Sequence, residues 1–323
     1  EFQQALRWGR SRDGHLLLPV FPYNHTSMLS PQDVQSLFVW LQTVESVDRA
    51  APEHRLTWPL GTQPIIAIWR SLFFAPTPFQ ENVNESAQWN RGAYLVQSAG
   101  HCAACHGQRN QLGSFPAVDD LSGGFLFPQM WTAPSLIDAA QTSIANNTPE
   151  ETAHLLRAGN SQSAHASGPM AEFVQYAGQY MTPADALAIG IYLKSRVQSS
   201  TPAPVHASSL VSPSSPSGQA LYQTHCATCH GENGEGKTKV YPALAGNPAV
   251  VLTRPENLIQ MTLYGGYGPS TGSTPRPYGM PPYLFTLNNQ QIADILTHIR
   301  NQWGNHAQAV SPMQVDRLRS ASY

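Results

Sequence analysis

Three stretches of the chain share one arrangement of apolar and polar positions. Each opens with Ser, Thr or Asn at a helix-capping position, after which apolar residues recur at three- and four-residue spacing. Two of the three have Pro directly after the cap, where proline fits the first turn of a helix. The pattern predicts three helices with one buried face each, over residues 29–41, 181–193 and 287–299.

Helical patterns also precede the two cysteine pairs. WNRGAYLVQSAGH leads to the first pair and GQALYQTH to the second, so a helix, a cysteine pair and a capped helix occur twice in the same order. The capped helix at 29–41 has no such front half. Residues 1–50 therefore indicate the back half of a domain whose front half lies upstream of Glu1. The alternative is a degenerate domain that never carried the same group.

Composition narrows the class of protein. Lys and Arg number 18 against 20 Asp and Glu, so there is no basic excess of the kind that nucleic acid or anionic lipid attracts. Charged residues are only 12% of 323, whereas Pro (27) and Gly (24) are frequent. This balance favours short helices joined by long ordered loops. No apolar run approaches the roughly 18 residues of a membrane-spanning helix.

The cysteines give the strongest chemical signal, because both pairs belong to the pattern C-x-x-C-H, which attaches c-type haem. Two thiols three positions apart on one helical turn can add to the two vinyl groups of one porphyrin, and the next histidine can present a nitrogen to the iron. The predicted haem-attachment residues are Cys102, Cys105, Cys226 and Cys229. The predicted iron ligands are His106 and His230. Since covalent haem is attached outside the cytoplasm, the pattern also predicts a periplasmic protein.

Other uses of paired cysteines fit less well. A zinc site would leave the histidine after each pair without a role. A thioredoxin-like redox pair needs a preceding strand and a βαβ context, whereas helical patterns precede both pairs. Structural disulfides would give no reason for one five-residue pattern to occur twice. Haem attachment is the interpretation that we favour.

A methionine before the last helix of each domain would complete the iron coordination, raise the haem potential and close the iron to outside ligands. In the third domain, RPYGMPPY favours Met280 over Met261, whose surroundings LIQMTLYGG indicate core. In the second domain, SGPMAEFV favours Met170, with Met181 and His165 as alternatives.

The first segment has Phe21 at the place of Met280, and phenylalanine cannot bind iron. A haem there would need His25 or Met28, and we favour His25, which gives bis-histidine ligation and a lower potential. A surface histidine and a core methionine remain the alternative. His101 and His225, each directly before a cysteine pair, are assigned no iron.

The expected fold class is all-α, with tandem class I-like c-type cytochrome domains and long loops. The apolar stretch 65–74 is predicted to pack against the second domain, or else to offer a surface to the membrane or a partner. The predicted parts are the back half of a first haem domain (1–50), a connector rich in proline and aromatic residues (51–85), a second haem domain (86–197), a Pro/Ser linker (198–217), a third haem domain (218–306) and a C-terminal tail (307–323).

Longer stretches resemble a known family. WNRGAYLVQSAGHCAACHGQRNQLG, GPMAEFVQYAGQYMTPADALAIGIYLKS and IRNQWGNHA are similar to the multi-haem cytochrome c subunits of bacterial membrane-bound alcohol, gluconate, fructose and aldehyde dehydrogenases. The resemblance covers nearly the whole chain. It implies three haems, a position on the periplasmic face of the inner membrane, and transfer of electrons to ubiquinone or another cytochrome. The missing first C-x-x-C-H is the main departure.

One branch of that family is most similar. HLLLPVFPYNHTSMLSPQDVQSLFVWLQTV and LTWPLGTQPIIAIWRSLFF resemble the cytochromes that accompany molybdopterin/iron–sulfur dehydrogenases of aldehydes or N-heterocycles. The alcohol branch would be expected to have methionine where Phe21 stands.

We therefore expect an electron-transfer subunit that takes electrons from a catalytic dehydrogenase subunit and does not itself bind the substrate. A di-haem peroxidase is one alternative, but it needs an open sixth position at one iron, against which Met170 and Met280 argue. A soluble electron shuttle working alone is the other.

Overall fold

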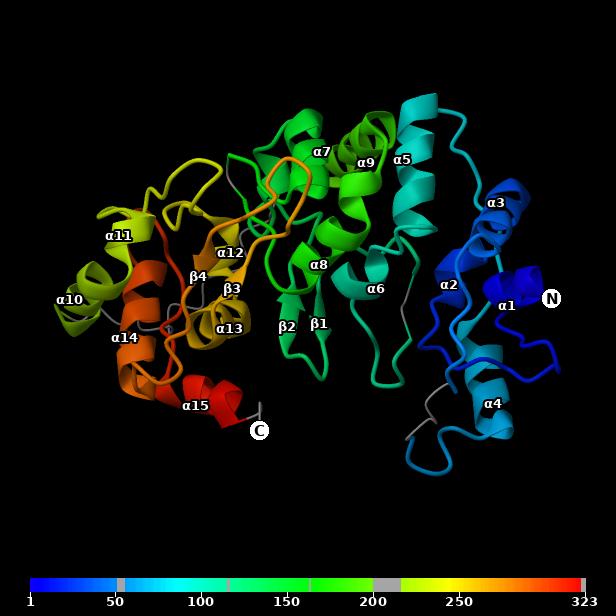
Figure 1. Ribbon diagram of the computed structural model, residues 1–323, viewed down its shortest axis with the longest axis horizontal. Coiled ribbons are helices and arrows are strands. Elements are labelled where there is room, and N and C mark those ends of the chain that lie inside the picture. Colours follow the sequence, from blue (N-terminus) through cyan, green and yellow to red (C-terminus); the bar gives the residue numbers. More distant parts are fainter. Residues whose placement is uncertain (51–55, 115–116, 163, 200–215, 321–323) are drawn as a thin grey trace. The chain divides into compact units, whose positions relative to one another are not determined.

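The computed structural model describes residues 1–50, 56–114, 117–162, 164–199 and 216–320. Helices dominate these residues, and the strands form two short antiparallel pairs (Figure 1). The all-α class predicted from the sequence is confirmed. The chain divides into two compact units, Glu1–Leu121 and Ser122–Tyr323. This division falls inside the predicted second haem domain, and the predicted linker 198–217 lies mostly outside the described residues.

The first unit begins each of its predicted helices at a capping side chain. The hydroxyl of Ser30 accepts a hydrogen bond from the amide of Asp33, and that of Ser86 from the amide of Trp89. The helices of this unit in the described residues are α1 (Phe2–Trp8), α2 (Tyr23–Thr26), α3 (Pro31–Leu41), α4 (Gln63–Phe73), α5 (Ala87–Gln97) and α6 (Ala103–His106).

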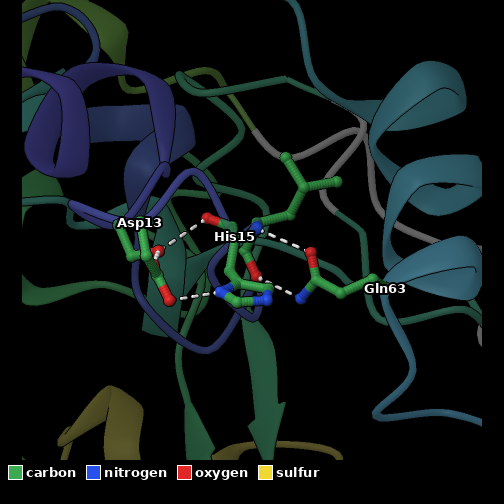
Figure 2. A network of polar contacts seen from close by, with 5 residues as sticks. Asp13, His15 and Gln63 are labelled. Carbon is green, nitrogen blue, oxygen red and sulfur yellow. Dashed lines mark hydrogen bonds and ion pairs between the residues drawn. The ribbon is translucent and has the colours of Figure 1, made fainter.

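Helix α4, which contains most of the apolar stretch 65–74, packs mainly against the first segment. At its start the Gln63 side chain accepts from the Leu16 amide at 2.8 Å and donates to the Leu16 carbonyl at 3.1 Å, beside the Asp13–His15 pair (Figure 2). Near its end the Arg70 guanidinium donates to the Trp8 carbonyl at 2.6 Å. The prediction that this stretch packs against the second haem domain is therefore wrong for most of its length. One hydrogen bond, from Trp69 to the Leu112 carbonyl at 2.8 Å, does join α4 to that domain.

The second unit opens with a hairpin that the sequence patterns did not predict. Strands β1 (Gly124–Leu126) and β2 (Trp131–Ala133) are antiparallel. The elements that follow are η1 (Ser143–Ala145), α7 (Pro149–Ala158), α8 (Pro169–Tyr176), η2 (Gly178–Tyr180), α9 (Pro183–Arg196), α10 (Pro216–His225), α11 (Ala227–His230), α12 (Pro248–Val251), α13 (Glu256–Tyr264), β3 (Gly266–Tyr267), β4 (Gly279–Met280), α14 (Asn289–Arg300) and α15 (Pro312–Ser320).

The two predicted terminal helices of this unit form as expected. Thr182 caps α9, and Asn288 caps α14 in a capping box with Gln291. Helix α14 crosses α10 at close range, because a Cβ added to Gly218 would lie 2.4 Å from the Asp294 carbonyl oxygen. This crossing builds the core of the third haem domain, in which Tyr222 and most of α14 are buried.

The C-terminal segment belongs to that core. The sequence indicates a tail after residue 306, but Val315 and Leu318 on α15 are buried in the same cluster as α14. Arg319 donates to the Leu287 carbonyl at 2.8 Å and the Tyr264 hydroxyl donates to the Leu318 carbonyl at 2.9 Å. Residues 307–320 therefore close one side of the third haem domain.

Within the second unit, residues of the predicted second haem domain are joined to the third by specific polar contacts. The Asn257 side chain on α13 accepts from the Thr132 amide at 2.8 Å and donates to the Thr132 carbonyl at 2.7 Å. Gln260 donates to the Met130 carbonyl at 2.8 Å. Paired amide contacts of this kind fix both distance and orientation, so hairpin β1–β2 has one defined position on α13.

The α10–α14 crossing generates a stability prediction. Gly218→Ala places a methyl group against the backbone of α14, so the helices must separate, and we expect a loss of about 1–3 kcal/mol of unfolding free energy. Urea unfolding of the haem-loaded chain, followed by haem absorbance, measures it. Gly272→Ala is the control, because no atom lies within 4 Å of the added Cβ and that residue has no positive φ. Equal midpoints for the two variants would contradict the prediction.

Candidate haem sites

The two C-x-x-C-H pentapeptides adopt the same turn. In each, the carbonyl of the first cysteine accepts from the amides of the second cysteine and of the histidine. The distances are 3.2 and 2.8 Å in residues 102–106 and 3.2 and 3.0 Å in residues 226–230. The four cysteines form no disulfides. Each pair therefore presents two thiols from a single helical turn, as attachment to one porphyrin requires.

The second pentapeptide opens onto a cavity of about 310 Å³. This third-domain cavity brings together the attachment cysteines, the predicted iron ligands and residues that the sequence had placed elsewhere. Residues of these three kinds on its wall are Cys226, Cys229, His230, Met280, Met261 and His165. Met280 is distant from the cysteine pair along the chain, so the fold creates this grouping.

The His230 imidazole is held in the state that an iron ligand needs. Its Nδ1 lies 2.9 Å from the Pro242 carbonyl oxygen, and since a carbonyl only accepts, Nδ1 carries the proton. Burial lowers the pKa of His230, which favours the neutral ring. The Nε2 lone pair is thus available to a metal, and the hydrogen bond fixes the orientation of the ring. These residues fit a covalently bound haem.

Met280 is positioned by a strand pair that its sequence context did not reveal. It pairs with Gly266 between β3 and β4, and a Cβ on the preceding Gly265 would lie 2.3 Å from the Met280 carbonyl oxygen. Gly265 has φ +64°, so glycine suits this close approach on both counts. Met261 also lines the cavity and is only half-buried, so the indication that it belongs to the core is wrong. Met280 as the sixth ligand remains a prediction.

The first pentapeptide lies in the first unit on a tightly turned backbone. A Cβ on Gly107 would lie 2.7 Å from the carbonyl oxygens of both Ala103 and Asp120. The Gln108 amide donates to the Asp120 carboxylate at 2.9 Å. Burial raises the pKa of the Cys102 thiol to about 12, so this thiol is protonated before it reacts. His106 is half-buried at the end of α6.

Met170, the predicted sixth ligand for the first pentapeptide, lies in the second unit in the first turn of α8. Gly168 precedes it with φ +52°, and a Cβ there would lie 2.7 Å from the Trp131 ring, so the entry to α8 depends on glycine. Both Met170 and the alternative Met181 are half-buried. Met170 remains the predicted ligand.

His25 is fully buried in the first unit, so the alternative of a surface histidine is wrong. Its Nδ1 lies 2.9 Å from the Gln97 carbonyl oxygen at the end of α5, and its ring centre lies 6.4 Å from that of His101. Burial lowers the pKa of His25 to about 4, so the ring is neutral near pH 7. Met28 is also buried, as expected for a core methionine. Iron ligation by His25 stays a prediction.

Three residues of the third-domain cavity carry polar or basic groups that sequence reasoning did not assign to this site. They are His165, Lys239 and Arg276. His165 was considered only for the second domain, because it precedes Met170 in the chain. No spacing signal links it to a cysteine pair that follows so much later in the sequence.

These features define a c-type cytochrome with covalently bound haem. Residues 216–303 match the family described as Cytochrome c. The chain is 33% identical to the alcohol dehydrogenase (quinone), cytochrome c subunit of Komagataeibacter europaeus, over 99% of this chain and 72% of that protein. For the gluconate 2-dehydrogenase cytochrome c subunit of Pantoea cypripedii the values are 32%, 99% and 76%. For one of the subunits of the nicotinate dehydrogenase of Pseudomonas putida they are 31%, 94% and 25%.

The chain therefore belongs to the family of cytochrome c subunits of bacterial dehydrogenases, as the resemblance in its sequence implied. The names of these relatives give no support to a peroxidase.

The third-domain cavity generates a prediction about its two methionines. Met280→Ala should abolish the ferric absorption band of methionine-sulfur ligation at one haem, since the sixth ligand is removed, and lower the potential of that haem. Met261→Ala is the matched control, because this methionine lines the same cavity and should leave the band in place. Spectra of the oxidised full chain measure both. Loss of the band in Met261→Ala alone would reverse the assignment.

Proposed function

We propose that the chain is the electron-transfer subunit of a periplasmic dehydrogenase complex. It would receive electrons from a catalytic dehydrogenase subunit and pass them through its haems to ubiquinone. The observation that carries this proposal is the His230–Pro242 hydrogen bond behind a C-x-x-C-H turn, because it prepares a fixed imidazole for a low-spin, closed iron. The relatives support the partner, since two of them are named as cytochrome c subunits of alcohol and gluconate dehydrogenases.

The haem supplies the one-electron chemistry, and the chain determines where and at what potential it occurs. The cysteine turns retain the porphyrin and bring the axial imidazole with it. The β3–β4 pair fixes the loop that carries Met280. Burial by α10, α13 and α14 keeps water from the site. None of these roles binds or activates an organic substrate, which fits a subunit that leaves oxidation to its partner.

We propose a periplasmic location and peripheral association with the inner membrane. The haem-attachment motif supports the compartment. In the part of the chain that the structure describes, no helix has both the length and the apolar character to cross a bilayer. The connector exposes apolar side chains at Trp58, Ile68 and Leu72, which are 82, 57 and 66% exposed. A surface of this kind suits a contact with the catalytic subunit or the membrane surface.

We further infer that residues 1–50 form the back half of a first haem domain. Helix α14 buries eight residues, whereas Val34 is the one buried residue of α3. The apolar residues at the end of α3 are 38–60% exposed in this structure; they are Leu37, Phe38, Val39, Trp40 and Leu41. A preceding helix with its own C-x-x-C-H and haem would cover that surface, as α10 covers α14. A third haem, with His25 as the proposed ligand, follows from this inference.

The branch of the family is also a proposal. Identities of 33, 32 and 31% to the alcohol, gluconate and nicotinate enzymes do not separate these groups. Phe21 in place of a methionine favours the branch that serves molybdopterin/iron–sulfur dehydrogenases of aldehydes or N-heterocycles.

Purification of the native assembly tests the proposed function. We expect the chain to co-purify with a catalytic dehydrogenase subunit, and its haems to be reduced when the substrate of that subunit is added and reoxidised by a soluble ubiquinone analogue. The control is the Cys226→Ala, Cys229→Ala chain, which should assemble with one haem fewer and slower reoxidation. A monomer that purifies alone would support a shuttle, and peroxide turnover by the isolated chain would support a peroxidase; either would contradict the proposal.

The same material tests the first domain. Mass spectrometry of the mature polypeptide should find three covalent haems if a haem-bearing segment covers α3. Two haems would support the degenerate domain instead.

A further inference from the structure

His165 comes from the predicted second haem domain but lines the third-domain cavity, together with His230 and Met280. Its Nε2 is buried and has no hydrogen-bond partner in the structure. A buried donor without a partner destabilises a fold, so such an atom calls for a ligand or a function.

The loop that carries His165 is held in place on both sides. A bridge pairs Asn160 with His165, and the Ala166 amide donates to the Gly159 carbonyl at 2.8 Å. Gly159 in turn lies against the third domain, since a Cβ there would be 2.1 Å from Pro269. The imidazole therefore occupies the cavity wall because the two predicted domains are packed together at this point.

The charges on the cavity wall point to an anion. Lys239 and Arg276 line the cavity, and its lining, as far as the described residues form it, includes no Asp or Glu. Lys239 has φ +60°, a conformation that costs energy for a residue with a side chain and that tends to occur at functional sites. A haem attached at Cys226 and Cys229 brings two propionate carboxylates, and these are the anions expected in this cavity.

We propose that His165 donates a hydrogen bond from Nε2 to a propionate of the third-domain haem. The second haem domain thereby contributes a positioning residue to the haem of the next domain. The proposal rests on the covalent haem at Cys226 and Cys229, but not on the identity of the catalytic partner.

The iron is the other group that an imidazole could bind. Its two axial positions are matched by His230 and by the predicted Met280, both from the third domain. A donor contributed by the neighbouring domain, on a wall with two basic groups, fits the carboxylate edge better than the metal.

The consequence is a link between domain packing and redox potential. A donor on a propionate reduces the negative charge that the ferric iron experiences, so it favours the reduced haem. If the contact at Gly159 and Pro269 opened, the third-domain haem would lose this donor and its potential would fall. The haem would then be a poorer acceptor from its neighbour, which makes electron transfer depend on correct packing.

Three substitutions in the full haem-loaded chain test the proposal. The Gln amide nitrogen can replace His Nε2 as a donor, whereas the Asn amide nitrogen falls at the position of Nδ1, so the pair distinguishes the two ring atoms. We expect His165→Ala and His165→Asn to shift the reduction equilibrium of one haem about tenfold toward the ferric form, about 59 mV for one electron. His165→Gln should restore most of the potential. His306→Ala is the control, because His306 is exposed and does not line the cavity.

Spectroelectrochemical titration measures the potentials, and the third-domain haem is identified as the component whose methionine-sulfur band is lost in Met280→Ala. An unchanged potential in His165→Ala, or no recovery in His165→Gln, would overturn the proposal. Altered axial-ligand spectra in His165→Ala would overturn it in favour of an iron ligand. Mass spectrometry keeps this result separate from the haem assignment, since a chain without haem at Cys226 and Cys229 would remove the basis of the proposal before any potential was measured.

Discussion

The structure depends on one constraint: two thiols and an imidazole must face the same porphyrin from a single helical turn. The turn at 226–230 meets it by backbone hydrogen bonding, and the Pro242 carbonyl then fixes which nitrogen of His230 carries the proton. The loop 231–242 is needed for that bond, and its return places Lys239 and Tyr241 on the cavity wall. Much of the third domain can thus be understood as the support of one imidazole.

The same constraint explains why α14 and α3 differ although their sequences predict equivalent helices. Both have a capping side chain and apolar residues at helical spacing. Burial of that face requires the helix before the cysteine turn, as the contact of Gly218 with the backbone of α14 illustrates. Helix α3 has no such partner in the described residues, and its terminal apolar side chains are exposed. Local pattern sets where a helix begins, whereas its partner determines whether the apolar face is buried.

The sequence was sufficient for features encoded within a few residues. The caps at Ser30, Thr182 and Asn288 form as predicted, since each depends on one side chain and an amide three positions later. It was insufficient for features made by distant segments. The β3–β4 pair joins two residues at each strand, too few for an alternating pattern. His165 reaches the third-domain cavity through contacts such as that of Gly159 with Pro269, which no spacing rule contains.

These long-range contacts bear directly on electron transfer. A multi-haem protein needs fixed distances between its cofactors, and flexible linkers cannot supply them. In the second unit the distances are set by the Asn257–Thr132 amide pair, by Gln260 on the Met130 carbonyl and by the close approach at Gly159. Each of these contacts is polar or steric and therefore directional, whereas an apolar surface of the same size would permit sliding. Directional contacts between haem domains allow one domain to place a side chain such as His165 at the cofactor of the next.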